Sequence, residues 1–326
     1  MTDGENAYRL YSTVQKRNIE WLWYPYIPYG KITLLQGDPG DGKSTCMINI
    51  AACLSVGGIL PNGEKLSEAQ NVIYQCAEDS VNDTVKPRLE QAGADCTKIA
   101  FIEKKEAEVS LLDSRIEQTI QKLKVRLAII DPIQAFLMQD CNMNSATRMR
   151  SVLNRLAGIA EKYNCAVVLI GHMNKSSGGK ELYRGLGSID IAALARSVLM
   201  ISKDKNNPSI RYLLQLKSNL APIKEAFAFT IDSTGGFLWL GGFCREGNYP
   251  GDEEEQKVKI TKLEKVQELL KIMLSTQDIP AKDVLGRMEK MEISERTVRS
   301  GAKNVGVTAY RKNKIWYWSL QKSRQG

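Results

Sequence analysis

The chain has a single histidine, His172, and its cysteines include no C-x-x-C pair. Because structural zinc sites draw their ligands from close pairs of cysteine and histidine, this composition argues against a zinc module. The cysteines are scattered, odd in number and mostly set among apolar neighbours, which favours reduced thiols packed in a core. They are Cys46, Cys53, Cys76, Cys96, Cys141, Cys165 and Cys244.

Long apolar runs are also missing. No run approaches the ~20 residues that a membrane-spanning helix needs. The first residues, MTDGENAYRLYSTVQKRN, lack the apolar stretch of a signal peptide. We therefore expect a soluble cytoplasmic protein with no membrane partner. With 326 residues, 43% of them hydrophobic, the chain can form one large domain and a smaller one.

Positive charge is concentrated near the C-terminus. Residues 256–326 hold 16 Lys and Arg against 7 Asp and Glu, a balance of +9, whereas the preceding residues hold 29 against 30. A basic block of this kind is typical of a polyanion-binding module, and nucleic acid is the obvious polyanion.

The region before this block alternates apolar, strand-like runs with helical stretches. Runs such as LAII and AVVLI are continuous, which is typical of strands buried on both faces of a parallel sheet. The order predicts an α/β fold with a mostly parallel central sheet. We expect strands at 31–36, 71–76, 127–130, 166–170, 197–201, 212–217 and 227–231, and helices at 44–55, 83–92, 111–123 and 147–163.

The polar stretch GNYPGDEEE, residues 247–255, contrasts with this pattern. Its glycines, proline and acidic run predict an exposed linker. We place the linker at 251–258, between a large core at 1–250 and a C-terminal domain at 259–326.

The strongest chemical signal is GDPGDGKST, which fits the phosphate-binding pattern G-x-x-x-x-G-K-[ST] between a strand and a helix. Glycines let backbone N–H groups turn towards phosphates, and the helix adds its positive N-terminus. The lysine can reach the β- and γ-phosphates of ATP, and the serine can bind Mg²⁺. The predicted ATP-binding residues are Gly37, Asp38, Pro39, Gly40, Asp41, Gly42, Lys43, Ser44 and Thr45.

Acidic residues follow two further strands. Asp131, at the end of LAIID, is expected to hold Mg²⁺ together with Ser44, although a residue before Pro132 can also serve as a helix cap. Hydrolysis needs a carboxylate that polarises the attacking water. Glu78 is the preferred candidate, and its neighbour Asp79 remains the alternative.

His172 follows the AVVLI strand and is expected to sense the γ-phosphate. The loop after it is polar and basic. We expect this loop to contact single-stranded DNA, with a plain solvated surface loop as the alternative. Its cations are Lys175, Lys180 and Arg184.

The order of these motifs resembles the RecA-like P-loop ATPases. Together with RGLGSIDIAALARSV, LQLKSNLAP and the lead-in IEWLWYPYIPYGKIT, it is most similar to the RepA-type hexameric replicative helicases of plasmids, phages and other mobile elements. The resemblance covers residues 21–242. It implies a hexameric ring that hydrolyses ATP between subunits and moves on single-stranded DNA. It also gives Glu78 the water-activating role and His172 a switch role. Arg196 becomes a finger that reaches a neighbour's γ-phosphate, and Lys217 a second cation acting in trans.

The basic C-terminal region has its own pattern. Helices are expected at 262–274, 281–291 and 295–304, the last capped by Ser294, followed by strands at 307–311 and 315–320. Three helices and a hairpin resemble a winged helix-turn-helix, a fold that binds duplex DNA or, alternatively, protein. The predicted DNA contacts are Arg296, Arg299 and Lys303 on the third helix and Arg311, Lys312 and Lys314 on the hairpin.

These inferences combine into one hypothesis, a DNA-dependent ATPase that acts as a replicative helicase or helicase loader. Two other functions fit the same motifs. One is a DNA-binding regulatory protein that uses ATP as an assembly switch, and the other is a recombinase-like filament protein.

Overall fold

The structure of the chain is a computed structural model. It describes residues 8, 10–103, 109–137, 146–172, 189–204, 207–232, 235–243, 262–274, 278–289, 293–312 and 314–320.

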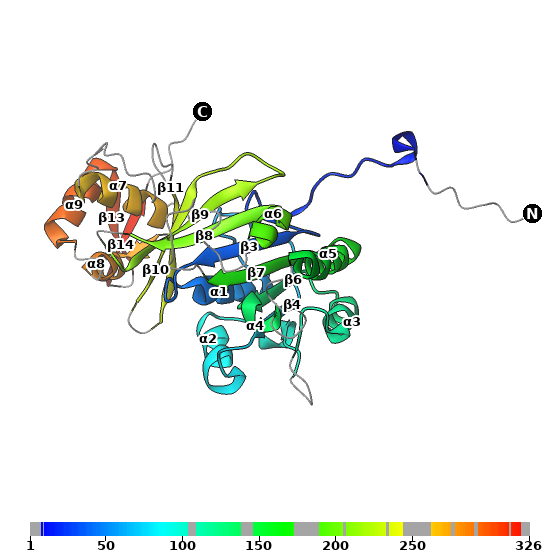
Figure 1. The fold of residues 1–326 in the computed structure, drawn as a ribbon. Coiled ribbons are helices and arrows are strands. Elements are labelled where there is room, and N and C mark those ends of the chain that lie inside the picture. Colours follow the sequence, from blue (N-terminus) through cyan, green and yellow to red (C-terminus); the bar gives the residue numbers. More distant parts are fainter. Residues whose placement is uncertain are drawn as a thin grey trace, which may run out of the picture.

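A nine-stranded sheet forms the centre of the molecule (Figure 1). Its strand order is β11-β10-β9-β8-β3-β7-β6-β4-β5. The strands from β8 to β5 run parallel, and β9, β10 and β11 extend the sheet antiparallel. The predicted α/β fold with a mostly parallel sheet is therefore confirmed. The strands are β3 (Ile32–Gly37), β4 (Val72–Cys76), β5 (Ile99–Ala100), β6 (Leu127–Asp131), β7 (Ala166–His172), β8 (Ser197–Lys203), β9 (Ile210–Ser218), β10 (Ala226–Ile231) and β11 (Phe237–Phe243).

Helices cover both faces of this sheet (Figure 1). Successive strand residues point to opposite faces, so Leu34 packs in one core cluster and Leu35 in the other. This burial on both faces explains why the central strands are continuously apolar. The cluster of Leu35 contains α1 (Lys43–Ser55) and α2 (Lys86–Gln91), whereas that of Leu34 contains α3 (Ser114–Leu123), α4 (Ile133–Leu137), α5 (Ala146–Tyr163) and α6 (Ile189–Leu194).

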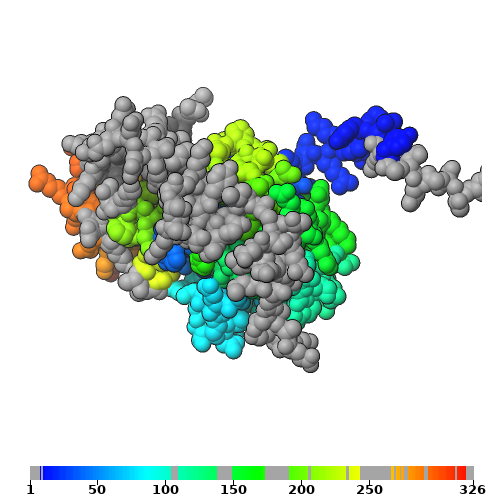
Figure 2. Space-filling view, viewed as in Figure 1, coloured from blue at the N-terminus to red at the C-terminus, as the bar shows by residue number. Residues whose placement is uncertain are grey.

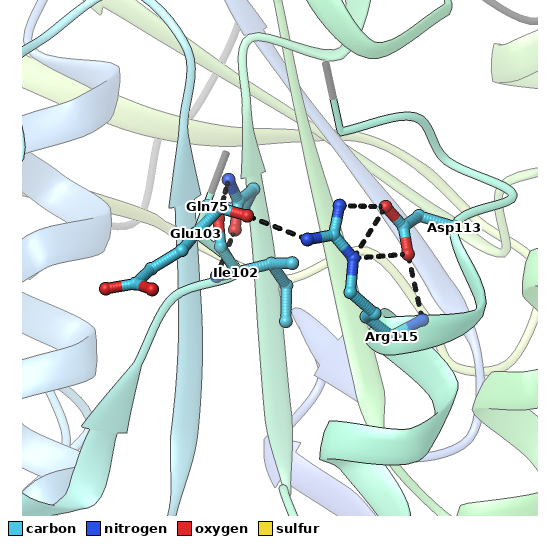
Figure 3. Close-up of polar contacts among 5 residues, drawn as sticks. All are labelled: Gln75, Ile102, Glu103, Asp113 and Arg115. Carbon is cyan, nitrogen blue, oxygen red and sulfur yellow. Dashed lines mark hydrogen bonds and ion pairs between the residues drawn. The ribbon is translucent and has the colours of Figure 1, made fainter. Parts of the chain in front are cut away.

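Side chains rather than ladder hydrogen bonds fix the chain beyond the edge strand β5 (Figure 3). The buried amide of Gln75 accepts from Ile102 N at 2.7 Å and donates to Ile102 O at 3.3 Å. Arg115 donates to Glu103 O at 2.8 Å and is itself held by the carboxylate of Asp113. These contacts fix residues 102 and 103 beside the end of β4, two residues before the chain reaches Glu78.

The N-terminal lead-in contributes a small hairpin, β1 (Trp21–Trp23) and β2 (Ile27–Pro28). Trp23 is 1% exposed, and its ring packs on Tyr26, Phe227 and Trp239 at centroid distances of 4.7, 5.2 and 5.7 Å. Residues 10–20, which include a short 3₁₀ turn at Tyr11–Thr13, are exposed and extend away from the body (Figures 1 and 2). The aromatic hairpin thus anchors the lead-in to the antiparallel part of the sheet.

The C-terminal residues form a module of three helices and a three-stranded sheet with the order β12-β14-β13. Its elements are α7 (Lys262–Met273), β12 (Ile279–Pro280), α8 (Ala281–Glu289), α9 (Glu295–Asn304), β13 (Val307–Lys312) and β14 (Ile315–Leu320). Ser294 caps α9 by accepting from Thr297 N at 3.3 Å. The module shares one apolar cluster with the outer face of the core sheet, where Val266 and Leu269 join Ile210 and Leu240. The predicted linker at 251–258 lies outside the described residues.

Among the described helices, none is both long and apolar enough to cross a membrane. Five of the cysteines lie in the described ranges, and all five are free thiols. Cys46 and Cys165 are buried, and burial raises the pKa of Cys165 to about 12, so this thiol stays protonated.

Candidate nucleotide-binding site

The P-loop, residues 37–44, connects β3 to α1 at the carboxyl edge of the parallel strands. Two glycines make this connection possible. A side-chain carbon at Gly37 would collide with the carbonyl oxygen of Ile201 on β8. Gly42 has φ 92°, in the left-handed region, where it serves as the N-cap of α1. The loop therefore places the N-terminus of a 13-residue helix at the ligand-binding edge of the sheet.

Lys43, the first residue of α1, is 4% exposed. Its ammonium donates to Gly37 O at 2.9 Å and to Asp38 O at 2.8 Å, both within the loop. Burial lowers the pKa of Lys43, and the carboxylates of Asp41 and Asp131 act against this shift. The lysine is thus held inside the loop, where its charge is available to a phosphate.

The two predicted Mg²⁺ residues, Ser44 and Asp131, lie together although they come from different elements. Asp131 ends β6 and is 5% exposed. Its Oδ2 accepts the hydroxyl of Tyr74 at 2.8 Å, and the same hydroxyl interacts with Ser44. This carboxylate and hydroxyl are oxygen ligands of the kind that Mg²⁺ prefers, and they would hold the ion if it is bound here. Among the described residues, no group of three or more histidine, cysteine, aspartate or glutamate side chains is arranged to hold a metal ion by itself.

Tyr74 is a site residue that the sequence motifs do not indicate. It is buried in β4, and burial followed by the charge of Asp131 raises its pKa well above the usual range, so it donates rather than ionises. Its relation to Asp131 depends on the register that pairs Cys76 with Asp131 across β4 and β6. No motif encodes that register.

The structure separates the two candidate catalytic carboxylates. Glu78 Oε1 lies 3.8 Å from Nε2 of His172, which ends β7, and its charge reaches Lys43. Asp79 instead accepts Arg88 Nη1 of α2 at 2.7 Å. Asp79 is therefore held by an ion pair directed towards α2, whereas Glu78 lies beside His172. The choice of Glu78 as the catalytic carboxylate stays a prediction.

Arg196 and Lys217 lie at the other end of the parallel strands, near the amino ends of β3 and β8. Arg196 is exposed, and its backbone N–H donates to Ile32 O at 3.0 Å, at the start of β3. At about 3.3 Å per residue, this position is roughly 16 Å from Gly37 along the strand. Neither side chain is therefore placed to serve the P-loop of its own chain.

Lys217 lies in strand β9, and its ammonium already has three partners. It donates to the carbonyls of Ala192, Ala193 and Ala195 at 2.7, 3.1 and 3.0 Å, at the C-terminal end of α6. Burial, followed by the charge of Arg196, lowers its pKa. Within one chain Lys217 caps a helix, and a role at a neighbour's nucleotide would require it to leave these carbonyls.

The predicted DNA-contacting residues fall into two groups. Lys175, Lys180 and Arg184 lie outside the described residues. The six predicted contacts in the C-terminal module are all exposed, and Arg299 forms an ion pair with Glu295 at 2.7 Å. These six residues are Arg296, Arg299, Lys303, Arg311, Lys312 and Lys314.

Comparison with known proteins places this site in a family. The profile of the AAA domain family AAA_25 matches residues 9–178, which include the P-loop, Glu78, Asp131 and His172. The chain is also similar to the "DNA repair protein RadA" of Chlamydia pneumoniae (27% identity, 63% of this chain and 40% of that protein). The Streptococcus pneumoniae protein of the same name is 27% identical, over 63% of this chain and 43% of its own length. That of Bacillus subtilis is 26% identical over 45% and 28%.

The chain thus spans less than half the length of these relatives. The family match, in contrast, covers more than half of this chain and contains the nucleotide site. The chain belongs to the AAA domain family of P-loop ATPases with a RecA-like core.

Proposed function

We propose that this protein is a DNA-dependent ATPase that forms a ring and acts as a replicative helicase, or a helicase loader, of a mobile element. The observation that carries the proposal is that the phosphate- and Mg²⁺-binding groups lie at one end of the parallel strands and an exposed arginine lies at the other end. Lys43, Ser44 and Asp131 lie at the carboxyl edge, whereas Arg196 lies at the other. Subunits arranged head to tail would bring the two edges together.

At the proposed site each residue has a distinct role. Lys43 binds the β- and γ-phosphates, and Ser44 and Asp131 hold Mg²⁺, with Tyr74 orienting the carboxylate. Bound Mg²⁺ would neutralise charge on the phosphates. Glu78 polarises the attacking water, and His172, 3.8 Å from it, relates the state of the γ-phosphate to the loop after β7.

A pocket of about 530 Å³ is the proposed site of the nucleoside. It opens beside the P-loop helix and is bounded by α1, α2 and the turn between β10 and β11. The pocket begins next to the P-loop and follows the first turns of α1. If the phosphates bind in the loop, the ribose and base of ATP can occupy this pocket. The residues around it include Thr45, Asn49, Arg88, Gln91, Ile231 and Asp232.

Mixing two inactive variants tests action in trans. Arg196→Ala protein and Lys43→Ala protein should each be inactive, and their mixture should regain part of the ATPase activity. Each mixed interface can pair an intact P-loop with an intact finger from its neighbour, and a trans arginine is worth ~10³–10⁵ in rate. Absence of rescue, when mixed oligomers are shown to form by native mass spectrometry, would assign Arg196 another role.

We further propose that the C-terminal module is a winged helix that binds duplex DNA. Its helix α9 and its hairpin β13–β14 both present exposed cations. Deletion is a poor test, because Val266 and Leu269 pack on the core sheet and their loss would expose Ile210 and Leu240. Substitutions in the full chain avoid this problem.

Replacing Arg311, Lys312 and Lys314 with serine should weaken duplex binding and leave ATPase activity without DNA unchanged. The slope of log affinity against log salt concentration should flatten by up to about 0.9 for each lost phosphate contact. The control is Lys122→Gln, which removes an exposed cation from α3. An unchanged affinity and slope in the triple variant would make the module a protein-binding domain.

A recombinase-like filament is the second candidate function, because the similar proteins are named DNA repair proteins. Electron micrographs separate rings from filaments. A strand-displacement assay separates a helicase from a regulatory protein that uses ATP only to assemble.

A further inference from the structure

Two cations that no motif indicates, Lys203 and Arg211, lie next to the P-loop in the same chain. Lys203 ends β8 and Arg211 is the second residue of β9. The antiparallel register pairs them directly, so both side chains emerge on one face of the sheet at its carboxyl edge. Like charges directly opposite each other on neighbouring strands are destabilising. Their placement therefore calls for an anion between them and the loop.

Asp41 of the P-loop provides such an anion. Its side chain is 10% exposed, and Oδ1 lies 3.5 Å from Lys203 Nζ. Its other oxygen accepts Asp38 N at 3.1 Å, which fixes the carboxylate within the loop. A side-chain carbon at Gly40 would lie 3.8 Å from the same ammonium. Lys203 thus rests on the P-loop itself.

Arg211 lies against the start of α1. A side-chain carbon at Gly42 would lie 3.3 Å from Arg211 Cδ and 3.4 Å from Nε. One terminal nitrogen, Nη1, donates to Ser209 O at 3.2 Å. Nε is buried and has no hydrogen-bond partner in the described part of the chain. A buried donor of a charged group without a partner is costly, and it points to an anion that is supplied from outside the chain.

The charges of this cluster explain why it is needed. A carboxylate inside a phosphate-binding loop repels the phosphates that the loop must hold. The loop contains two carboxylates, Asp38 and Asp41. Lys43, Lys203 and Arg211 together carry three positive charges against these two negative charges. One positive charge is left over next to Gly42, where the phosphates are expected to bind.

We propose that Lys203 and Arg211 are cis positioning residues of the nucleotide site, which neutralise Asp41 and leave a net positive charge for the phosphates of ATP. The proposal rests on the nucleotide site proposed above, and it concerns cations of the same chain rather than the trans finger Arg196. In a site with an effective dielectric constant of about 20, removal of one nearby unit charge is expected to lower phosphate affinity by about tenfold or more before screening by salt.

A double-mutant cycle in the full chain tests the proposal. Binding of fluorescent Mg-ATP and Mg-ADP analogues is titrated for wild type, Lys203→Met, Asp41→Asn and the double variant. Lys203→Met keeps the apolar stem and should weaken ATP binding about tenfold, with a smaller loss for ADP. Adding Asp41→Asn should restore most of the affinity, because the uncompensated carboxylate is removed with it. Arg211→Met should also weaken ATP binding more than ADP binding.

The controls keep the result interpretable. Lys203→Arg retains the charge and should retain the affinity. Lys162→Met breaks a 2.9 Å ion pair with Glu117, between α5 and α3, and should leave binding unchanged. Wild-type affinity in Lys203→Met, or no recovery in the double variant, would overturn the proposal while leaving the nucleotide site intact. If wild-type protein binds no ATP, the proposed function itself fails.

Discussion

Replacing Lys43 with alanine is expected to reduce ATP turnover by at least about 10²–10³-fold and to weaken nucleotide binding. The physical reason is the position of the ammonium, which is buried inside the loop and points at the carbonyls of Gly37 and Asp38. Lys43 is the only lysine or arginine among P-loop residues 37–44. Alanine therefore removes the one positively charged side chain that the loop itself can offer to a phosphate. Loss of a preorganised charge at a reacting phosphate has an effect of this size.

The measurement is a steady-state ATPase assay with purified protein, accompanied by thermal unfolding to confirm that the variant is folded. Lys162→Ala serves as the matched control, because it removes an exposed lysine from α5 on the other face of the sheet. Near-normal turnover in Lys43→Ala would exclude this loop as the ATP site.

Glu78→Gln is expected to lower the hydrolysis rate by about 10²–10⁴-fold while ATP still binds. The amide keeps the shape of the side chain but cannot polarise the attacking water. Glu78 is suited to this role because its Oε1 lies 3.8 Å from His172 Nε2 and because its negative charge is close enough to Lys43 to raise the pKa of that lysine. Single-turnover hydrolysis and equilibrium ATP binding, measured on the same protein, separate the two effects.

Asp79→Asn provides the matched comparison one residue away. Asp79 is held by Arg88 of α2, so its loss should alter stability slightly and leave the rate of hydrolysis near that of wild type. Collapse of hydrolysis in Asp79→Asn, with a normal rate in Glu78→Gln, would reverse the assignment of the catalytic acid.

The sequence predicted most of the core sheet because its central strands carry a strong physical signal. Strands such as β6 and β7 are buried on both faces, and a short continuous apolar run bounded by polar residues is typical of such strands. Strand β11 was not predicted. It contains Gly241 and Gly242, which weaken its strand signal, and the register shifts between Ala228 and Phe229 where it pairs with β10. The short helix α4, only five residues, gives no periodic pattern.

The sequence predicts those parts of the candidate site whose residues form a contiguous motif or directly follow a predicted strand. The P-loop and the residues that end β4, β6 and β7 fall at one edge because parallel strands end on the same side. Tyr74, Lys203 and Arg211 were not predicted, because their relation to the site depends on register and on packing between distant segments. Lys217 was singled out by its motif, but its three hydrogen bonds to α6 could not be predicted, because they also depend on packing between distant segments.

In the proposed function, ATP hydrolysis at this P-loop is coupled to DNA. This coupling is tested most directly by measuring the ATPase rate of the full chain with and without single-stranded DNA, beside the Lys43→Ala variant. We expect a basal rate in wild type that rises when single-stranded DNA is added, and no rate above background in the variant under either condition. An equal wild-type rate with and without DNA, or no wild-type hydrolysis at all, would contradict the proposed coupling.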